Sequence, residues 1–308
     1  MAQSRFINRL RAIHWDPAHW ARMSLQTFGK ALTRLWGRDV MLYVGGVSFF
    51  SMLAIFPALA ILINLYSLLS DPAAAAREGE ALSFLIPAGA RDIFRYELLR
   101  LASAPHAAMS AQSGLALLIG LYAAHRGFKA MLAGLSFIHD EDEPRGFVGF
   151  NLMALAVLVA AFAGLAVVSA LFFGLRVLGE AFEFRPLRGA SWLYSEWTWA
   201  SAGMALGMML IYRWAMSRDP VDWRASALGG AVASGLCIFA SWALGIYVEQ
   251  IAALGATYGS IATVVIFLIW LSWNVNSLFF GGALATEVEI ALHRHRLPLP
   301  SDLGGLRG

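Results

Sequence analysis

The longest uncharged stretch of the chain limits its fold more than any other feature. No Asp, Glu, Lys, Arg or His occurs between Glu249 and Glu287, and the run from Tyr258 onward is rich in Ile, Val, Leu, Phe and Trp. About 20 consecutive apolar residues are enough to cross the hydrocarbon core of a bilayer as a helix. The stretch therefore predicts a membrane-spanning helix.

The composition extends this prediction to the whole chain. Of the 308 residues, 59% are hydrophobic and only 14% are charged, whereas soluble domains carry about 25% charged residues. So few charges cannot cover a water-facing surface of this size, and we expect an integral membrane protein. The single cysteine, Cys237, excludes an intrachain disulfide.

Long apolar runs separated by charged or proline-containing connections predict an all-α bundle of six transmembrane helices. The expected spans cover residues 40–69, 107–138, 147–175, 191–212, 225–248 and 256–288. Residues 70–106 carry three prolines and mixed charges, and we expect short helices there on the outer side of the bundle. Residues 40–292 form the transmembrane domain, and residues 293–308 a basic tail without fixed structure.

The first 39 residues are expected to hold an amphipathic helix that lies in the membrane interface. Apolar side chains recur there at helical spacing, and basic side chains fall on another face, which suits contact with anionic headgroups. The residues are Leu25, Phe28, Leu32 and Leu35 on one face and Arg22, Lys30 and Arg34 on another. A partner-binding arm is the alternative for this segment.

Lys and Arg are distributed unevenly over the predicted connections. The N-terminal region, the connections 125–149 and 213–224 and the C-terminal tail hold 16 of them, against 7 on the opposite side. Connections rich in Lys and Arg stay in the cytoplasm. Both termini are therefore predicted to be cytoplasmic.

Small, polar and basic residues within the spans form a candidate substrate path. Its first-span residues lie close to one helical face, and Pro57 removes a backbone donor and predicts a kink. Arg126 would meet an anionic group of the substrate. The path consists of Gly45, Ser48, Ser51, Pro57, Arg126, Asn274, Ser277 and Gly281.

Each of these features also has a purely structural interpretation. Asn274 and Asn276 can make interhelical hydrogen bonds, and both cannot face one cavity because two residues turn a helix by about 200°. Gly281 and Gly282 can serve close helix packing alone. Arg126 is either an anion contact or a charge that reaches the interface along its own side chain. The sequence leaves these alternatives open.

Charged and aromatic residues near the predicted span ends complete the set of candidates. Glu196 is an acidic residue embedded in an apolar run, and it is either a proton-coupling carboxylate or part of an interfacial aromatic belt. Trp192 and Trp197 belong to that belt as interfacial anchors. Lys129 is most simply an interfacial anchor as well.

The sequence patterns of several enzyme classes are missing. The chain has no Gly-rich phosphate loop, no CxxC pair and no GxSxG, and His293 and His295 have no further ligand at metal spacing. A metal-dependent hydrolase needs several converging ligands. We therefore expect no enzymatic activity, metal, cofactor or nucleic-acid partner. The expected partners are membrane lipids and a second copy of the chain.

Three sequence blocks together form a family pattern. They are GGVSFFSMLAIFPALAILI, then YAAHRGFKAMLAGLSFI with Arg126-Gly127 in the matching place, and a last block from Tyr212 to Glu289 with Tyr258-Gly259 and Gly282-Ala283. This pattern resembles the YihY/BrkB family of bacterial inner-membrane proteins, formerly described as ribonuclease BN-like. One departure is Leu284, where the family pattern more often has an acidic residue, with Glu287 three positions later.

The resemblance implies a six-helix fold in the bacterial inner membrane and roles in moving lipids or other amphiphiles or in virulence. Our main hypothesis is a transporter or translocator of a lipid or other amphiphilic anion. It would not be driven by its own ATPase, since no nucleotide-binding loop is present. The alternative is a non-transporting scaffold or regulator of envelope assembly, and a ribonuclease is more distant.

Overall fold

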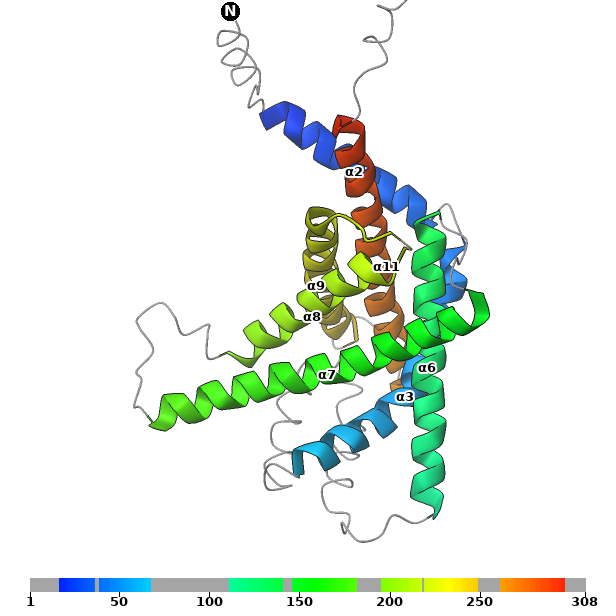
Figure 1. The fold of residues 1–308 in the computed structure, drawn as a ribbon, viewed down its shortest axis with the longest axis vertical. Coiled ribbons are helices and arrows are strands. Elements are labelled where there is room, and N and C mark those ends of the chain that lie inside the picture. Colours follow the sequence, from blue (N-terminus) through cyan, green and yellow to red (C-terminus); the bar gives the residue numbers. More distant parts are fainter. Residues whose placement is uncertain are drawn as a thin grey trace, which may run out of the picture.

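The computed structural model describes residues 17–36, 39–67, 111–140, 146–181, 195–217, 219–248 and 261–296. Every long element among them is a helix, and these residues contain no strand (Figure 1). The helices are α2 (Pro17–Trp36), α3 (Val40–Ser67), α6 (Ala111–Ile138), α7 (Gly146–Ala181), α8 (Glu196–Trp214), α9 (Trp223–Ile246) and α11 (Ala262–Arg296). The all-α prediction is confirmed for the described residues.

Each of the six predicted spans overlaps one of these helices, from α3 to α11. By length and composition, three of the described segments can cross a membrane: Gly146–Val168, Trp223–Ile246 and Val264–His293. A fourth candidate is the pair Ser24–Trp36 and Val40–Ile55, which is bent by 73°. Six spans therefore stay a prediction. Residues 1–16, the insertion 70–106 and the tail from residue 297 lie outside the described residues.

α11 is the central helix, and α2, α3, α6, α8 and α9 all contact it (Figure 1). Small residues let its neighbours approach closely. A Cβ on Gly281 would lie 2.5 Å from the Cβ of Ala233 and 2.7 Å from the carbonyl oxygen of Gly229. A Cβ on Gly229 would lie 2.6 Å from the carbonyl oxygen of Gly281. The backbones of α9 and α11 are therefore in direct contact, as in small-residue crossings of membrane helices.

α3 and α6 also pack closely, but only over part of α3. A Cβ on Gly120 of α6 would overlap the ring of Pro57, and α3 continues as a helix through this proline. Further along, a Cβ on Gly127 would lie 3.3 Å from the Cβ of Phe50. Gly45, in contrast, is exposed and has no atom within 4 Å of its Cβ position. The small-residue face of α3 is thus open near its start and packed near Pro57.

α7 runs across the molecule at a steep angle to α6 (Figure 1). It contacts α6 on one side and α8 on the other. Only Ala154 and Leu158 of its described residues are fully buried, whereas Phe147 is 82% exposed. This helix therefore presents a broad apolar surface to its surroundings.

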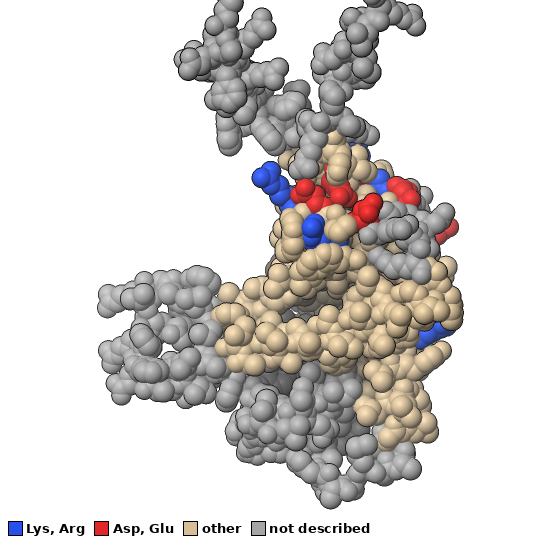
Figure 2. Space-filling view, in the orientation of Figure 1, with Lys and Arg blue, Asp and Glu red and all other residues tan. Residues whose placement is uncertain are grey.

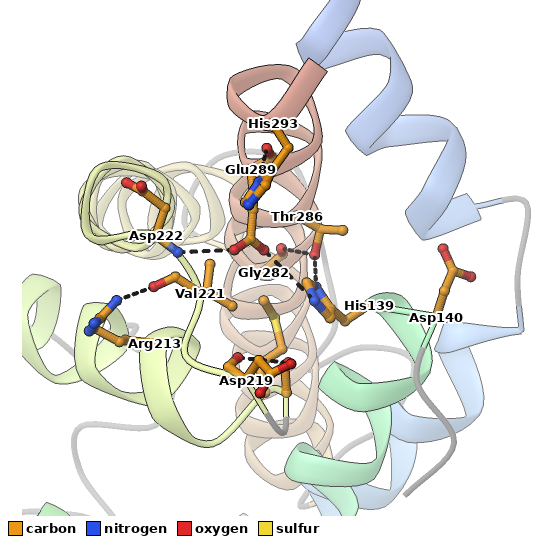
Figure 3. Close-up of polar contacts among 12 residues, drawn as sticks. His139, Asp140, Arg213, Asp219, Val221, Asp222, Gly282, Thr286, Glu289 and His293 are labelled. Atoms are coloured by element: carbon orange, nitrogen blue, oxygen red, sulfur yellow. Dashed lines mark hydrogen bonds and ion pairs between the residues drawn. The ribbon is translucent and has the colours of Figure 1, made fainter. Parts of the chain in front are cut away.

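Charged side chains gather at one end of the described molecule (Figure 2). The C-terminal turns of α11, the end of α2 and the α8–α9 connection lie at this end (Figures 1 and 3). The described surface away from it is mostly uncharged, apart from a small basic patch (Figure 2). The described part of the molecule therefore has one charged end and a long apolar body.

Candidate functional site

Arg34 connects three segments of the chain at the charged end. Its Nε donates to Oε1 of Glu287 at 2.8 Å, and its Nη1 donates to the carbonyl oxygen of Ile138 at 2.9 Å and to a carboxylate oxygen of Asp140. The Arg34 and Glu287 side chains are 13% and 10% exposed, so solvent screens this ion pair only weakly. Burial lowers the pKa of Arg34, but the hydrogen bonds that it donates to Asp140 and Glu287, together with the attraction of their charges, outweigh burial and leave the pKa raised.

This geometry corrects the expectation for the basic face of α2. Lys30 is exposed, as a residue that meets anionic headgroups would be. Arg34 instead turns toward the protein and pairs with carboxylates. On the apolar side, Leu35 is buried and Phe28 packs 4.9 Å from the ring of Phe280 on α11. α2 is therefore held to the bundle at its C-terminal half.

Asp140 reaches Arg34 because of the way in which α6 ends. Its backbone has a φ of 66°, in the left-handed region that Asp and Asn adopt more readily than other non-glycine residues. This conformation closes the helix after Ile138. The carboxylate can therefore pair with Arg34 of α2.

His139 and Glu289 join α6, α11 and the α8–α9 connection (Figure 3). Nδ1 of His139 lies 2.9 Å from the hydroxyl oxygen of Thr286, and its Nε2 lies 3.8 Å from Oε2 of Glu289. Oε1 of Glu289 accepts a hydrogen bond from the backbone N–H of Asp222 at 3.0 Å. Asp222 is also the N-cap of α9, where its side chain accepts from the N–H of Arg224. We call the whole cluster the charged junction: Arg34, His139, Asp140, Asp222, Thr286, Glu287 and Glu289.

The α8–α9 connection is braced beside the charged junction. The Arg213 guanidinium lies 4.2 Å from the ring centroid of Trp223 and donates to the carbonyl oxygen of Val221. One residue earlier, the buried hydroxyl of Tyr212 donates to the carbonyl oxygen of Leu278 on α11 at 2.6 Å. On the α6 side, Ser136 donates to the carbonyl oxygen of Met216 at 3.2 Å. Short-range polar contacts therefore fix this connection against both α6 and α11.

Three of the four segments that the Lys and Arg count assigns to one side of the membrane meet in this region, together with the end of the last predicted span. The three segments are the N-terminal region with Arg34, the 125–149 connection with His139 and Asp140, and the 213–224 connection with Asp222. The described residues contain no group of three or more His, Cys, Asp and Glu side chains that could hold a metal ion. The charged junction holds the ends of α2, α6 and α11 and the start of α9 together.

A second polar group, centred on Lys129 and Asn151, lies near the middle of α6. The ammonium of Lys129 donates to Oδ1 of Asn151 on α7 at 2.8 Å and lies 5.6 Å from the ring centroids of Phe147 and Phe150. Nε2 of His125 lies 3.4 Å from the same Asn151 oxygen, and its Nδ1 is buried without a partner among the described residues. Lys129 is thus held against α7.

Arg126 lies beside this group but faces α3. Its guanidinium carbon is 5.9 Å from the ring centroids of Phe50 on α3 and Tyr122 on α6, and its side chain is exposed. Neither Arg126 nor Lys129 pairs with a carboxylate in the described part of the chain. Two positive charges on α6 therefore have no carboxylate partner among the described residues.

The polar residues predicted on the first and last spans do not all lie at one helix contact. Some lie where α11 meets α3, and others where α11 meets α9. Ser48 of α3 is buried, and Ser272 of α11 donates to its hydroxyl at 3.4 Å. The carbonyl oxygen of Asn274 accepts instead from the thiol of Cys237 on α9 at 3.6 Å. The structure thus brings Ser272, rather than Asn274, to the serine face of α3.

The side chains of Asn274 and Ser277 bond to their own helix. Asn274 donates to the carbonyl oxygen of Trp270 at 2.8 Å, and Ser277 donates to that of Trp273 at 2.9 Å. Gly281 is buried in the contact with α9 described above, and Ser51 is half-buried on α3. A substrate path lined by these residues stays a prediction.

Three other candidates cannot be placed in the same way. α8 begins at Glu196, but the side chains of Glu196 and Trp197 lie outside the described residues. Trp192 lies entirely outside them. The proton-coupling and aromatic-anchor roles therefore stay predictions.

Sequence reasoning missed the charged junction as a cluster. The available signal was the position of opposite charges next to span ends on one predicted side: Arg34 precedes the first apolar run, while Glu287 and Glu289 end the last one. Charged residues at span ends on the same side of the membrane can form ion pairs with one another. The actual pairs depend on which helices are neighbours, and the apolar pattern of each helix does not specify this.

Together these features define a protein whose described residues are helical, include segments able to cross a membrane and carry most of their charges at one end. The chain matches the family model described as Virulence factor BrkB over residues 31–302, and it belongs to this family. It is also similar to the ribonuclease-like protein YfkH of Bacillus subtilis strain 168. The two are 26% identical over 266 residues, which cover 83% of this chain and 90% of that protein. No solved structure matches the chain.

Proposed function

We propose that this protein is a multi-pass protein of the bacterial inner membrane that translocates a lipid or other amphiphilic anion. The observation that carries the proposal is the place of Arg126, exposed near the middle of α6. It precedes the helix end at Ile138 by about 18 Å, at 1.5 Å per residue. In the topology that we propose, this helix end lies with the charged junction at the membrane surface, and Arg126 then lies deep in a hydrocarbon core about 30 Å thick.

A guanidinium at this depth needs partners that offset the cost of burying its positive charge. Charged side chains inside a membrane are costly and mark substrate or ion pathways. The aromatic rings of Phe50 and Tyr122 offset part of this cost through cation–π contacts. The described residues supply no carboxylate for the rest, so a bound anion is the partner that we propose. The apolar surroundings favour an anion that carries its own apolar part.

The proposed topology has six spans with both termini in the cytoplasm. It is supported by the bonds that join three of the predicted cytoplasmic segments to one another through the end of α11. Charges that bond to one another across helix ends must share one side of the bilayer. The excess of Lys and Arg on that side then points to the cytoplasm.

A non-transporting scaffold is the second candidate, and the outer surface of α2 and α7 favours it. Leu25 and Trp36 of α2 are largely exposed, as are Phe147 and Leu152 of α7. Apolar surface of this extent suits lipid contact or a partner helix. We do not propose nuclease activity, and the expected lack of enzymatic activity stays a prediction.

The proposed function can be tested in vesicles that contain the purified protein and a phosphatidylglycerol with a fluorescent headgroup. An impermeant quencher reports how fast the label moves from the inner to the outer leaflet. We expect movement with the wild type and at least a tenfold slower rate with Arg126→Ala at equal protein content. Arg224→Ala, which removes an exposed arginine at the start of α9, should match the wild type. Wild-type vesicles no faster than empty ones would favour the scaffold.

A further inference from the structure

Arg126 and Lys129 hold more hydrogen-bond donors than the described part of the chain satisfies. An ammonium has three N–H groups and a guanidinium has five. Lys129 uses one of them on Asn151, and Arg126 contacts only the faces of Phe50 and Tyr122 among the described residues. In an apolar environment such donors require a further acceptor.

The two cations lie on one face of α6. Residues three apart on a helix are neighbours, with Cβ atoms about 5–6 Å from each other, and like charges at this spacing repel. Phe50 of α3 borders the face beside Arg126, and Asn151 of α7 holds Lys129 on the other side. An anion with several oxygens between the two heads would relieve the repulsion and accept from both.

An exposed apolar strip continues from this face toward the N-terminal end of α6. Leu115, Leu118, Ile119 and Tyr122 recur at spacings of three, one and three, on the helix face that also carries Arg126. Each of them is 53–65% exposed. From Leu115 to Arg126 the strip measures about 16 Å along the helix, close to half of a hydrocarbon core about 30 Å thick.

We propose that Arg126 and Lys129 jointly bind the phosphate of an anionic lipid, with an acyl chain along the strip from Leu115 to Tyr122. This inference rests on the proposed function and names its substrate class and its binding residues. The phosphate lies near the middle of the membrane, and the acyl chain points away from the charged junction. Asn151 is a positioning residue that aims the ammonium of Lys129.

Binding of a defined lipid to the purified full-length protein tests the site. Native mass spectrometry would compare dioleoyl phosphatidic acid with dioleoyl phosphatidylcholine, which has the same chains, and with inorganic phosphate. We expect phosphatidic acid to bind at least fivefold more tightly than phosphatidylcholine, and inorganic phosphate not to displace it. The double variant Arg126→Ala/Lys129→Met should lose at least tenfold in affinity for phosphatidic acid, while Arg126→Lys should keep most of it.

Two controls separate binding from folding. Arg224→Ala removes an exposed charge elsewhere and should bind like the wild type. Lys129→Met keeps an unbranched side chain against Phe150, and Arg126 is exposed, so both variants should melt close to the wild type. If Lys129→Met melts at a lower temperature than the wild type, the affinity of Arg126→Ala alone decides the outcome. Unchanged affinity of Arg126→Ala for phosphatidic acid would overturn the inference. Equal binding of both lipids, or displacement of phosphatidic acid by inorganic phosphate, would overturn it as well.

The result can be distinguished from a failure of the proposed function. If the variants lose phosphatidic acid but wild-type vesicles move no lipid, the binding site stands and translocation is wrong. If the wild type and Arg126→Ala move lipid and bind it equally well, translocation stands and this site is wrong.

Discussion

At the residue scale, Arg34 shows how one side chain fixes the end of the bundle. It is nearly buried between Glu287 and Asp140 and also bonds the last carbonyl group of α6. Removing one partner of such a pair leaves the other charge buried and poorly solvated. Replacing both partners by apolar residues leaves no buried charge behind. The single substitutions should therefore be more harmful than the pair.

We expect Glu287→Met to lower the free energy of unfolding by about 2 kcal/mol, the cost of stranding a buried partner, and Arg34→Met to act in the same direction. The double variant should lose less than the sum of the two. Denaturant or thermal unfolding in detergent micelles measures the coupling as a double-mutant cycle. Lys30→Met, at an exposed position of the same helix, should change little. Strict additivity would show that the pair contributes no coupling.

The sequence predicted the helix that carries Arg34 but not the partner of this residue. Periodic apolar residues indicate α2, because burial of one helix face repeats every 3.6 residues. Arg34 falls on the basic face by the same count, and we expected it to meet headgroups. It reaches Glu287 because α11 passes beside α2. Local sequence patterns do not predict which helices become neighbours.

At the element scale, the contact between α9 and α11 depends on two glycines. Their backbones touch because Gly229 and Gly281 have no side chains to separate them. From the sequence, Gly281-Gly282 could be interpreted as a site of close helix packing. The sequence did not indicate that α9 would be the partner helix. Close packing of this kind provides much of the association energy of membrane helices, since lipid is as apolar as the helix surface.

Gly229→Ala should force α9 and α11 apart, because the new Cβ would lie 2.6 Å from a backbone oxygen and 2.9 Å from the Cβ of Ala285. Overpacking of this kind costs about 1–3 kcal/mol, which should appear as a lower melting temperature. Gly235→Ala on the same helix adds a Cβ in open space and should be neutral or slightly stabilising. Equal melting temperatures for the two variants would contradict the close crossing.

At the scale of the whole molecule, the side of the membrane assigned to each segment from the Lys and Arg count stays a prediction. Lys and Arg were assigned to one side by counting, and residues from the segments on that side bond to one another in the structure. The direction of α7 was not predictable. Its apolar residues predict a membrane helix of any tilt, and its steep crossing of α6 (Figure 1) is set by tertiary packing that the sequence pattern does not specify.

The depth of the basic face of α6 is the premise on which both the proposed function and the lipid site depend. A nitroxide on Tyr122→Cys, one turn from Arg126, and one on Asp219→Cys at the charged end can be compared in vesicles after Cys237→Ser removes the native thiol. Accessibility to oxygen and to a water-soluble nickel chelate reports depth. We predict that the label at residue 122 is reached by oxygen and shielded from nickel, and that the label at residue 219 shows the reverse. Equal nickel accessibility at both positions would place Arg126 at the surface and contradict the account.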